Sequence, residues 1–570
     1  MTDMTQPSLR HGPAERLFGW TRGRVARLRR DPATLAAAMM LLAFVLFVST
    51  QVVGDYQSDN GDYYQYQMHA DNLRAGAPWD RFVDGYPSVL PGWPVMLLLW
   101  QTLFGGSFTP IGVLNALLWA GCAWIYNGLF ARLGWRPGVR VAFVALMCVC
   151  PSVIANVQEG QPNLFAAFAT ALALSAAYRM AGPGPELDLA GEGTTRPGWA
   201  AARAPAFLLL SLVRVESAVV YLASAIHFAV RGRWRPFAWC VLGMALTLGV
   251  SAWLAVAFDM KSNLSHGTSI IGKNGMSELG SSWAALQWLE HRVAYFGALL
   301  ARTLEAFAPQ GFSLGETVTV SVPPRFDETF SLFTLAALGL MAVGLFAREC
   351  RVDAQGGPGV GGVRALAATW LTPMKLTLAG HLAFWTLVGL DFVHDRYLFP
   401  VLPIALAFAV RGAALVLGGL GRAAAPAGVL LTLALTGMVA THMEFERTQA
   451  KRRNAINHPA AVAAYDAFAA RVSPGQRIGA YKPRVLTGEL YKRGALSVRA
   501  NTFRYPFQVE KHSEDGALIF VDWRAKPGVR EGLREDGRLC VLWAERGYEI
   551  WGPPSAAHPC LPPESEEPQD

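Results

Sequence analysis

The sequence predicts a mainly α-helical protein that crosses a membrane many times and carries a small α/β domain near its C-terminal end. The first observation is composition, because 52% of the 570 residues are hydrophobic and only 16% are charged, which is too apolar for an ordinary soluble enzyme. The second is that several apolar runs approach the roughly 20 residues needed to cross a bilayer. The third is a polar stretch after Thr441 in which helix and strand patterns alternate.

Hydropathy divides residues 35–442 into about eleven transmembrane spans, with interfacial helices between some of them. The expected spans are 35–53, 108–130, 139–156, 163–180, 204–213, 217–230, 236–258, 329–347, 375–391, 397–417 and 424–442. The first is longer and more uniformly apolar than the core of a signal peptide, so we expect it to remain as an anchor. Residues 1–34 carry seven arginines, and the positive-inside rule therefore places this segment in the cytoplasm.

The apolar segment 90–104 is the ambiguous part of this topology. Pro91 and Pro94 lie on either side of Gly92, and proline interrupts the hydrogen bonding of a straight helix. A full crossing here would also place the arginines between positions 132 and 140 outside, against the positive-inside rule. We therefore interpret the segment as an interfacial or re-entrant helix.

With this topology, most of the polar groups that can carry chemistry lie on the outer face. They are Asp59, Asp62, Asp71, Asp80 and Asp84 in the first external loop (residues 54–107), Glu159 in the turn 158–161, the Arg214-Val215-Glu216 break, the loop 259–290 and the turn 391–397. A carboxylate beside the membrane can take a proton from a hydroxyl or amine acceptor. Arginine binds phosphate oxygens through its planar guanidinium. The pattern therefore indicates transfer of a phosphate-linked group.

Each of these residues also has a purely structural interpretation. Arg214 and Glu216 can form a pair that only locks two helices, although an ionisable pair inside an apolar stretch favours a function. Asp62 can be a solvated loop acid or a helix N-cap. Arg396 can be an interfacial arginine that snorkels, and Tyr86 can anchor the loop in the interface instead of stacking on a sugar.

Several motifs follow one another in an order seen in a known family. Asp62-Tyr63-Tyr64-Gln65-Tyr66 is followed by Ala70, Asn72-Leu73 and Gly76, then Gly85-Tyr86-Pro87, the arginines at 132–140, Pro151, Glu159, Arg214-Val215-Glu216 and Arg396-Tyr397-Leu398-Phe399-Pro400. Over most of residues 35–420, this order resembles the GT-C membrane glycosyltransferases. The specific likeness is to the branch that includes protein O-mannosyltransferases and lipid A aminoarabinose transferases.

The resemblance implies a GT-C fold and an activity. Members of this family transfer a sugar from a polyprenyl-phosphate donor on the outer face of the membrane, with inversion at the anomeric carbon. Their essential loop Asp is followed four residues later by Tyr and four further on by Ala, and Asp62, Tyr66 and Ala70 match that spacing. Asp62 is therefore the expected general base, and Asp59 is the alternative because it lies about one helical turn away.

The chain departs from the family pattern at Tyr63, where many relatives carry Glu, and this leaves any second-carboxylate role at that position in question. Asp84 or Glu159 can supply it. The residues that we expect to bind substrate are Tyr66, Asp84, Tyr86, Arg214, Glu216, His394, Arg396 and Tyr397. The donor phosphate is expected to contact Arg214 or Arg396, with the lipid tail against the apolar helices.

The polar residues 443–552 are predicted to form an α/β domain on the extracytoplasmic side, followed by a disordered tail at 553–570. The expected helices are 460–471, 483–493 and 529–536, and the expected strands are 477–481, 518–522, 539–543 and 548–551. Cys540 and Cys560 both fall here. They can form a disulfide in an oxidising compartment or remain as two free thiols.

The remaining expectations concern partners and competing functions. The net charge of +8 is carried largely at helix ends, where topology and anionic lipid explain it, so we expect no nucleic-acid binding. We expect no cofactor and no metal site, although a divalent metal stays possible because carboxylates are plentiful. The acceptor is a lipid, glycan or protein, and the expected location is the bacterial inner membrane. A polytopic transporter or lipid-linked sugar flippase is the alternative function, and a non-catalytic scaffold is a third.

Overall fold

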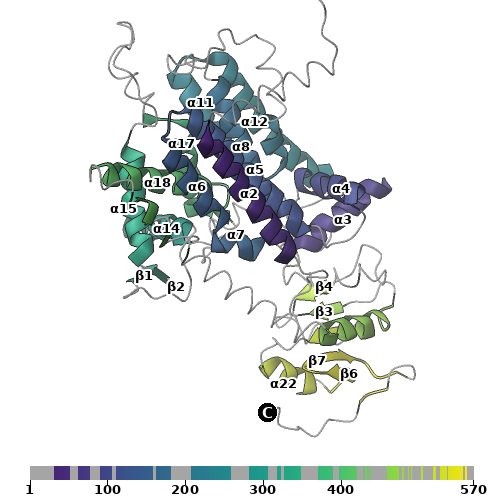
Figure 1. The fold of residues 1–570 in the computed structure, drawn as a ribbon. Helices are drawn as coiled ribbons and strands as arrows, with labels where there is room; N and C mark the ends of the chain where they lie inside the picture. The colour runs from purple at the N-terminus through teal and green to yellow at the C-terminus, as the bar shows by residue number, and fades with distance from the viewer. Residues whose placement is uncertain are drawn as a thin grey trace, which may run out of the picture.

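The fold is given by a computed structural model. It describes residues 31–51, 62–76, 90–104, 111–157, 162–180, 207–257, 282–305, 318–322, 326–330, 332–347, 370–388, 397–419, 459–473, 478–480, 502–504, 518–521, 527–535, 537–555 and 559–561, together with isolated residues between 426 and 437 and at 486 and 490. A large helical body occupies the first three quarters of the chain, and a smaller part with a β-sheet follows it (Figure 1).

The helical body is built from long helices and shorter ones. They are α2 (Pro32–Gln51), α3 (Asp62–Ala75), α4 (Gly92–Phe104), α5 (Ile111–Arg132), α6 (Pro137–Cys148), α7 (Pro151–Asn156), α8 (Asn163–Met180), η2 (Leu209–Leu212), η3 (Val215–Ser217), α11 (Ala218–Val230), α12 (Trp234–Ala257), α14 (Ser282–Glu305), α15 (Leu332–Phe346), α17 (Pro373–Val388) and α18 (Leu402–Gly418). A two-stranded antiparallel sheet, β1 (Val318–Val322) with β2 (Phe326–Phe330), precedes α15.

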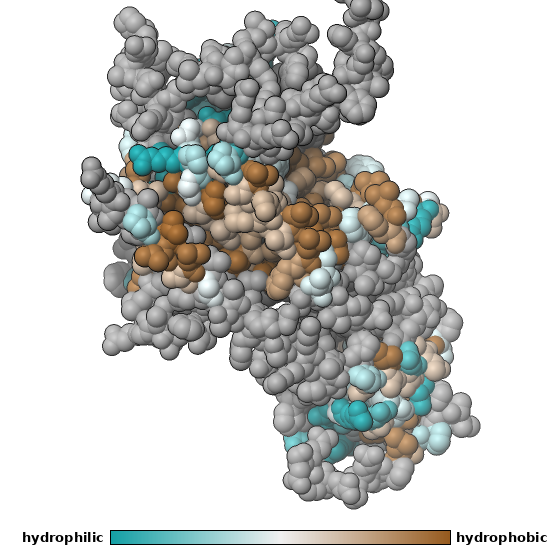
Figure 2. Space-filling model, in the orientation of Figure 1, coloured by the Kyte–Doolittle hydropathy of each residue, from teal (hydrophilic) through white to brown (hydrophobic). Residues whose placement is uncertain are grey.

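The protein is an integral membrane protein. Three of its described helices are long and apolar enough to cross a bilayer, namely Pro32–Thr50, Ile111–Arg132 and Trp234–Ala257. Large apolar side chains on these helices, such as Leu42 and Trp253, are exposed, which suits contact with lipid and not with water. Figure 2 shows a broad band of such apolar surface across the helical body, whereas the C-terminal part has a mixed surface.

Several elements differ from the sequence expectation, including strands β1 and β2, which it did not predict, and the expected span 204–213, where η2 is only four residues long. The expected span 139–156 is broken into α6 and α7, because Pro151 lacks the backbone N–H that would continue the helix and instead begins α7. The 24-residue helix α14 was not anticipated as an element. Its charged residues, among them Arg292 and Arg302, hide it from a hydropathy search, yet α14 packs against α15, α17 and α18 through buried residues such as Leu299.

Helices α15 and α18 cross in direct backbone contact. A side chain at Gly344 would overlap with the carbonyl group of Phe408, and one at Gly412 would overlap with the carbonyl group of Leu340. Small residues at a crossing let two helices approach closely enough for extensive van der Waals contact, which drives helix association inside a membrane. This crossing fixes α18 and therefore the segment just before it.

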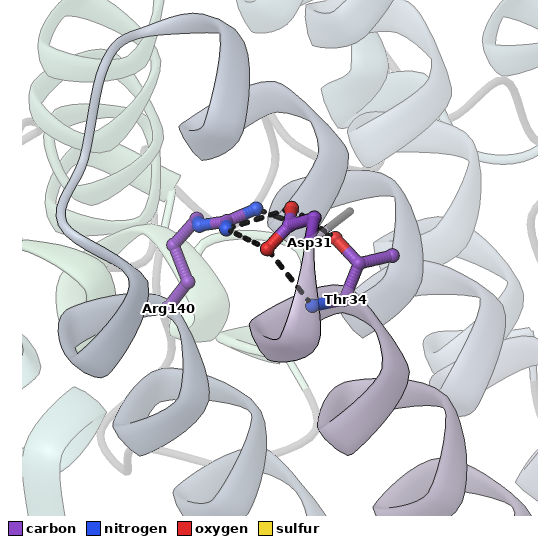
Figure 3. A network of polar contacts seen from close by, with 3 residues as sticks. All are labelled: Asp31, Thr34 and Arg140. Atoms are coloured by element: carbon purple, nitrogen blue, oxygen red, sulfur yellow. Dashed lines mark hydrogen bonds and ion pairs between the residues drawn. The ribbon is translucent and has the colours of Figure 1, made fainter. Parts of the chain in front are cut away.

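At the expected cytoplasmic end, an ion pair ties α2 to α6 (Figure 3). Both carboxylate oxygens of Asp31 lie 2.9 Å from Nη2 of Arg140, and the Thr34 hydroxyl donates to Asp31 at 2.6 Å. Burial raises the pKa of Asp31, but the hydrogen bonds from Thr34 and Arg140 and the charge of Arg140 outweigh it, so the net pKa is lowered. The carboxylate is thus held in its charged form.

The C-terminal part contains a five-stranded mixed sheet in the order β4-β3-β5-β7-β6. Its strands are β3 (Ile478–Ala480), β4 (Thr502–Arg504), β5 (Leu518–Val521), β6 (Cys540–Glu545) and β7 (Tyr548–Gly552). β3 is parallel to β4 and β5, and β7 is antiparallel to β5 and β6. Helix 459–469 and α22 (Pro527–Glu535) complete the part that the structure describes. All these strands except β4 coincide with a strand that the sequence predicts.

Cys540 and Cys560 form a disulfide, with 5.5 Å between their Cα atoms. The bond holds the chain beyond β7 against the edge strand β6, where the Leu561 amide donates to the carbonyl of Val541 at 2.7 Å. An edge strand offers unpaired backbone groups to other chains. The disulfide therefore helps to cover the open edge of the sheet.

We expect Gly412→Leu to lower the free energy of unfolding by about 3 kcal/mol or more, because the new side chain must push α15 and α18 apart. Thermal unfolding of the purified protein in detergent measures this. Gly339→Leu is the matched control, since an added Cβ at Gly339 on α15 meets no atom within 4 Å. Equal unfolding temperatures for the two variants would show that the close crossing does not contribute.

We expect five of the seven cysteines to react with a thiol reagent when the protein is denatured without reductant, because seven minus the two in the disulfide leaves five. Intact-mass analysis counts the added groups. The Cys560→Ser variant should add one further group, from the released Cys540. Seven groups on the unreduced wild-type protein would contradict the bond.

Candidate functional site

A buried ion pair lies at the break between η2 and η3. Arg214 has an extended backbone, with φ −153° and ψ 150°, so the helical path is interrupted at that residue. Its Nε lies against Oε1 of Glu216 in a close ion pair, and the two side chains are 16% and 7% exposed. A guanidinium is always charged, so the carboxylate of Glu216 provides the neutralising charge that burial requires.

Side chains from three distant segments surround Arg214. Nη1 donates to Oδ1 of Asn163, the first residue of α8, at 2.5 Å. The guanidinium carbon lies 5.5 Å from the centre of the Tyr397 ring, which is cation–π distance. Tyr66 of α3 is close enough to interact electrostatically with Arg214. Asn163 and Tyr397, which are 234 positions apart in the sequence (397 minus 163), therefore meet at one guanidinium.

Two residues of α17 hold Tyr397 in place. Nε2 of His381 lies 2.8 Å from the Tyr397 carbonyl oxygen and 3.1 Å from Nε1 of Trp385. It donates to the carbonyl in one tautomer and accepts from the indole in the other. The Trp385 ring stacks on the Tyr397 ring with 4.4 Å between centroids and 22° between planes. His381 is also close enough to interact electrostatically with Glu216 and Arg214. Leu398 and Phe399 follow Tyr397 and are fully buried, and their packing fixes the chain next to Tyr397.

Helix α3 is tied to α4 by a closed ring of polar contacts. Gln101 donates to Gln67 at 2.6 Å, Gln67 donates to Asp71 at 3.2 Å, and Arg74 donates to Gln101 at 2.7 Å. Arg74 also lies 3.8 Å from Asp71 in a partly exposed ion pair. Each group that loses water in this contact gains a partner, which is what burial of polar side chains requires.

Helix α4 contacts both α3 and the short helix η2, which lies next to the ion pair. Gly92 approaches η2 so closely that a side chain would overlap with the carbonyl of Leu212, and Trp93 lies 5.8 Å from Phe165 of α8 between ring centroids. On the other side, Val95, Leu99 and Leu103 are exposed at spacings of four. With 13 residues, α4 is about 20 Å long, shorter than the roughly 30 Å hydrocarbon core. These features favour the interfacial interpretation.

Four residues predicted to bind substrate, Tyr66, Arg214, Glu216 and Tyr397, are brought together in this cluster. The predicted base, Asp62, is the first residue of α3. The other predicted site residues, Asp59, Asp84, Tyr86, Glu159, His394 and Arg396, lie outside the described residues. Their roles stay predictions.

Sequence reasoning missed Asn163, His381 and Trp385. Asn163 was the easiest to find, because it starts a helix directly after the polar turn 158–161. His381 and Trp385 sit four residues apart in an apolar helix, a spacing that places both on one face. Nothing in the sequence says that this face meets Tyr397, because that depends on how α17 packs against the segment before α18.

Within the described part of the chain, no group of three His, Cys, Asp or Glu residues lies close enough together to hold a metal ion. The cluster instead offers a guanidinium paired with the carboxylate of Glu216, an amide and two phenol rings. Such a set suits an anion with several oxygen atoms, since charged hydrogen bonds from arginine to phosphate or carboxylate oxygens are strong and directional.

The fold is similar to solved membrane-protein structures. ArnT from Cupriavidus metallidurans, crystallised with undecaprenyl phosphate, matches with a TM-score of 0.50 and 12% identity, over 93% of this chain and 98% of that chain. The apo form of the same protein matches with a TM-score of 0.50 and 11% identity, over 90% and 97% of the two chains. AglB from Archaeoglobus fulgidus, an archaeal oligosaccharyltransferase in complex with an inhibitory peptide and a dolichol-phosphate, matches with a TM-score of 0.46 and 12% identity over 84% and 65%.

Neither a protein-family model nor a curated protein sequence matches the chain. The likeness to ArnT nevertheless extends over nearly the whole length of both proteins and includes the C-terminal part. The chain therefore has the GT-C fold of ArnT, as the resemblance of its motifs had indicated.

We expect Glu216→Gln to lower the free energy of unfolding by about 3 kcal/mol, because it leaves the buried charge of Arg214 without a counter-charge. Asp71→Asn is the matched control, since its ion pair with Arg74 is far more exposed and should contribute less than about 1 kcal/mol. Thermal unfolding in detergent compares the two. A change for Glu216→Gln no larger than for Asp71→Asn would mean that the pair does not stabilise this break.

Proposed function

We propose that the protein is an inverting glycosyltransferase that moves a sugar from a polyprenyl-phosphate donor to a lipid, glycan or protein acceptor at the outer face of the membrane. The observation that carries the proposal is the cluster of Arg214, Glu216, Asn163, Tyr66 and Tyr397 within a GT-C fold. The fold supports this reaction class, and the cluster offers a group that such a reaction needs, a fixed cation for the leaving phosphate.

Arg214 is the proposed phosphate ligand. A guanidinium has five N–H donors, and Glu216 and Asn163 hold it through Nε and Nη1. These two contacts orient the guanidinium, and its other N–H groups are the proposed donors to the phosphate oxygens. Tyr397 lies over the guanidinium, and Arg396, the preceding residue, is a second proposed phosphate ligand. The polyprenyl tail would lie along the lipid-facing helices.

In the proposed step, an acceptor oxygen or nitrogen attacks the anomeric carbon from the face opposite the phosphate. The bond between the sugar and the phosphate oxygen breaks, and the electron pair leaves with the polyprenyl phosphate. The acceptor proton passes to a carboxylate acting as general base. Direct attack opposite the leaving group inverts the configuration at the anomeric carbon.

Asp62 is the proposed base. It begins α3, and Tyr66, one turn further along the same helix, interacts electrostatically with Arg214. Positions 62, 66 and 70 recur every four residues, and Ala70 is buried against the helical body, so this face of α3 is directed toward the body. Asp59, Asp84 and Glu159 are the alternative carboxylates. Tyr86 and His394 are proposed to contact the sugar or the acceptor.

The proposed topology places the N-terminal segment in the cytoplasm and the C-terminal domain outside, in a bacterial inner membrane. Arg140, at the end of the body where α2 begins, would then be cytoplasmic. The disulfide of the C-terminal domain supports an oxidising compartment for that part.

We expect Asp62→Asn to reduce sugar transfer about a hundredfold or more, because a positioned general base contributes at least that much. The measurement is transfer of radiolabelled sugar from a panel of polyprenyl-phosphate donors in membranes that contain the protein and its native acceptors. Glu535→Gln is the control, since it removes an exposed carboxylate from α22 in the C-terminal part and leaves α3 and its contacts intact. Arg214→Lys should also lose transfer, because lysine cannot reproduce the planar fork.

Each other result points elsewhere. Undiminished transfer in a folded Asp62→Asn protein would assign the base to Asp59 or Glu159. Absence of transfer by the wild type with every donor would overturn the glycosyltransferase proposal, and uptake or flipping of a lipid-linked sugar by the same membranes would establish the transporter alternative.

A further inference from the structure

We propose that the C-terminal domain is a positioning element for α3, and that Met68 is the residue through which it acts. The inference rests on the proposed function, because α3 carries the proposed base at its first residue. It goes beyond that function by giving the C-terminal domain a role in the reaction. The domain would hold the reacting end of α3 against the Arg214 cluster.

Met68 belongs to the core of the C-terminal domain, although it lies nearly 400 residues earlier in the chain (460 minus 68 is 392). Its side chain is only 1% exposed. It is buried in one cluster with residues of helix 459–469 and the sheet, among them Ala460, Ala464, Phe468 and Leu542. In Figure 1, α3 lies at the end of the helical body that faces strands β3 and β4.

The opposite face of α3 packs on the helical body. Ala70 is a member of the main buried cluster of the body, and Tyr66 packs against that cluster. Met68 is two residues from each, which is about 200° around a helix with 3.6 residues per turn. Helix α3 is therefore enclosed between the two parts of the protein, with one face in each core.

A third contact holds α3 from the side, through the polar ring of Gln67, Asp71, Arg74 and Gln101. α3 needs such support, because it has 14 residues and isolated helices of about 12–15 residues are marginal in water. Its position therefore comes from tertiary contacts. Of the three, only the one through Met68 involves the C-terminal domain.

The consequence for the reaction is geometric. A general base works only within hydrogen-bond reach of the proton that it removes, and a displacement of about 1 Å can cost a hundredfold in rate. If the C-terminal domain leaves Met68, α3 keeps its contacts with α4 but loses the contact that presses it onto the body. The proposed base then moves while Arg214, which is held by η3 and α8, stays in place.

The test compares Met68→Asp with Met68→Leu in the full-length protein in detergent. Hydrogen exchange of peptides covering 62–76 should become about tenfold faster or more in Met68→Asp, because a carboxylate cannot stay in the shared apolar cluster. Met68→Leu should exchange like the wild type. Met68→Ala gives a milder loss of packing in case the aspartate variant fails to fold.

Leu533→Ala is the matched control in the C-terminal domain. Leu533 is fully buried in a separate cluster with Ile519, Val521, Leu539 and Trp551, so its truncation weakens the domain without removing the contact to α3. Exchange in 62–76 should then stay at the wild-type rate. Wild-type exchange of 62–76 in Met68→Asp, or equal acceleration in Leu533→Ala, would overturn the inference.

Sugar transfer supplies a second measurement. In Met68→Asp we expect kcat to fall about tenfold or more while the donor KM changes much less, since Tyr66 moves with α3 but the donor contacts at Arg214 are retained. The Met68→Leu variant should keep the wild-type kcat. Hydrogen exchange does not depend on turnover, so the two proposals fail in different ways. If the proposed function is wrong, the wild-type protein shows no sugar transfer. If this inference is wrong, exchange in 62–76 is unchanged in Met68→Asp. Unchanged kcat in a Met68→Asp protein with accelerated exchange would also overturn the positioning role.

Discussion

An arginine inside a membrane-embedded helical bundle requires a counter-charge and hydrogen-bond partners, because removing an ion from water costs far more than a single contact returns. Arg214 meets this requirement through Glu216, two residues away, and Asn163, at the start of α8. The short spacing is possible only because the backbone is extended at Arg214. The break in the helix is thus what allows the charge of Arg214 to be buried.

The elements around this pair are arranged to keep it buried and oriented. α4 approaches η2 at Gly92 without a side chain between them, and α17 holds Tyr397 over the guanidinium through His381 and Trp385. The backbone crossing of α15 and α18 fixes the segment that carries Tyr397. A cation prepared in this way need not reorganise when an anion binds, which is the basis of electrostatic preorganisation.

The two parts of the protein divide the proposed work. The helical body holds the cation and, in the proposed function, the lipid, whereas α3 lies between the body and the C-terminal domain. A helix of 14 residues with little apolar character has no stable position of its own. Packing it into two cores and joining it to α4 by polar contacts is a physical means of giving a surface element the precision that proton transfer requires.

The class of the protein and much of its architecture follow from patterns in the sequence. Hydropathy averaged over about 20 residues does not depend on tertiary contacts, so α2, α5 and α12 were predicted near their observed bounds. Strands β5, β6 and β7 were found because alternation within a few residues is a local property. The Arg214 and Glu216 pair was found because an ionisable pair in an apolar stretch is rare whatever surrounds it.

Only the tertiary structure decided which distant residues meet. The sequence gives no sign that His381 faces Tyr397, that Asn163 accepts from Arg214, or that Met68 enters the core of a domain almost 400 residues away. α14 was missed because its arginines lower its hydropathy while its other face packs in the bundle. The local sequence shows which chemical groups are present and whether a segment has the periodicity of a helix or a strand. Which distant residue a side chain contacts depends on packing, and packing depends on the whole chain.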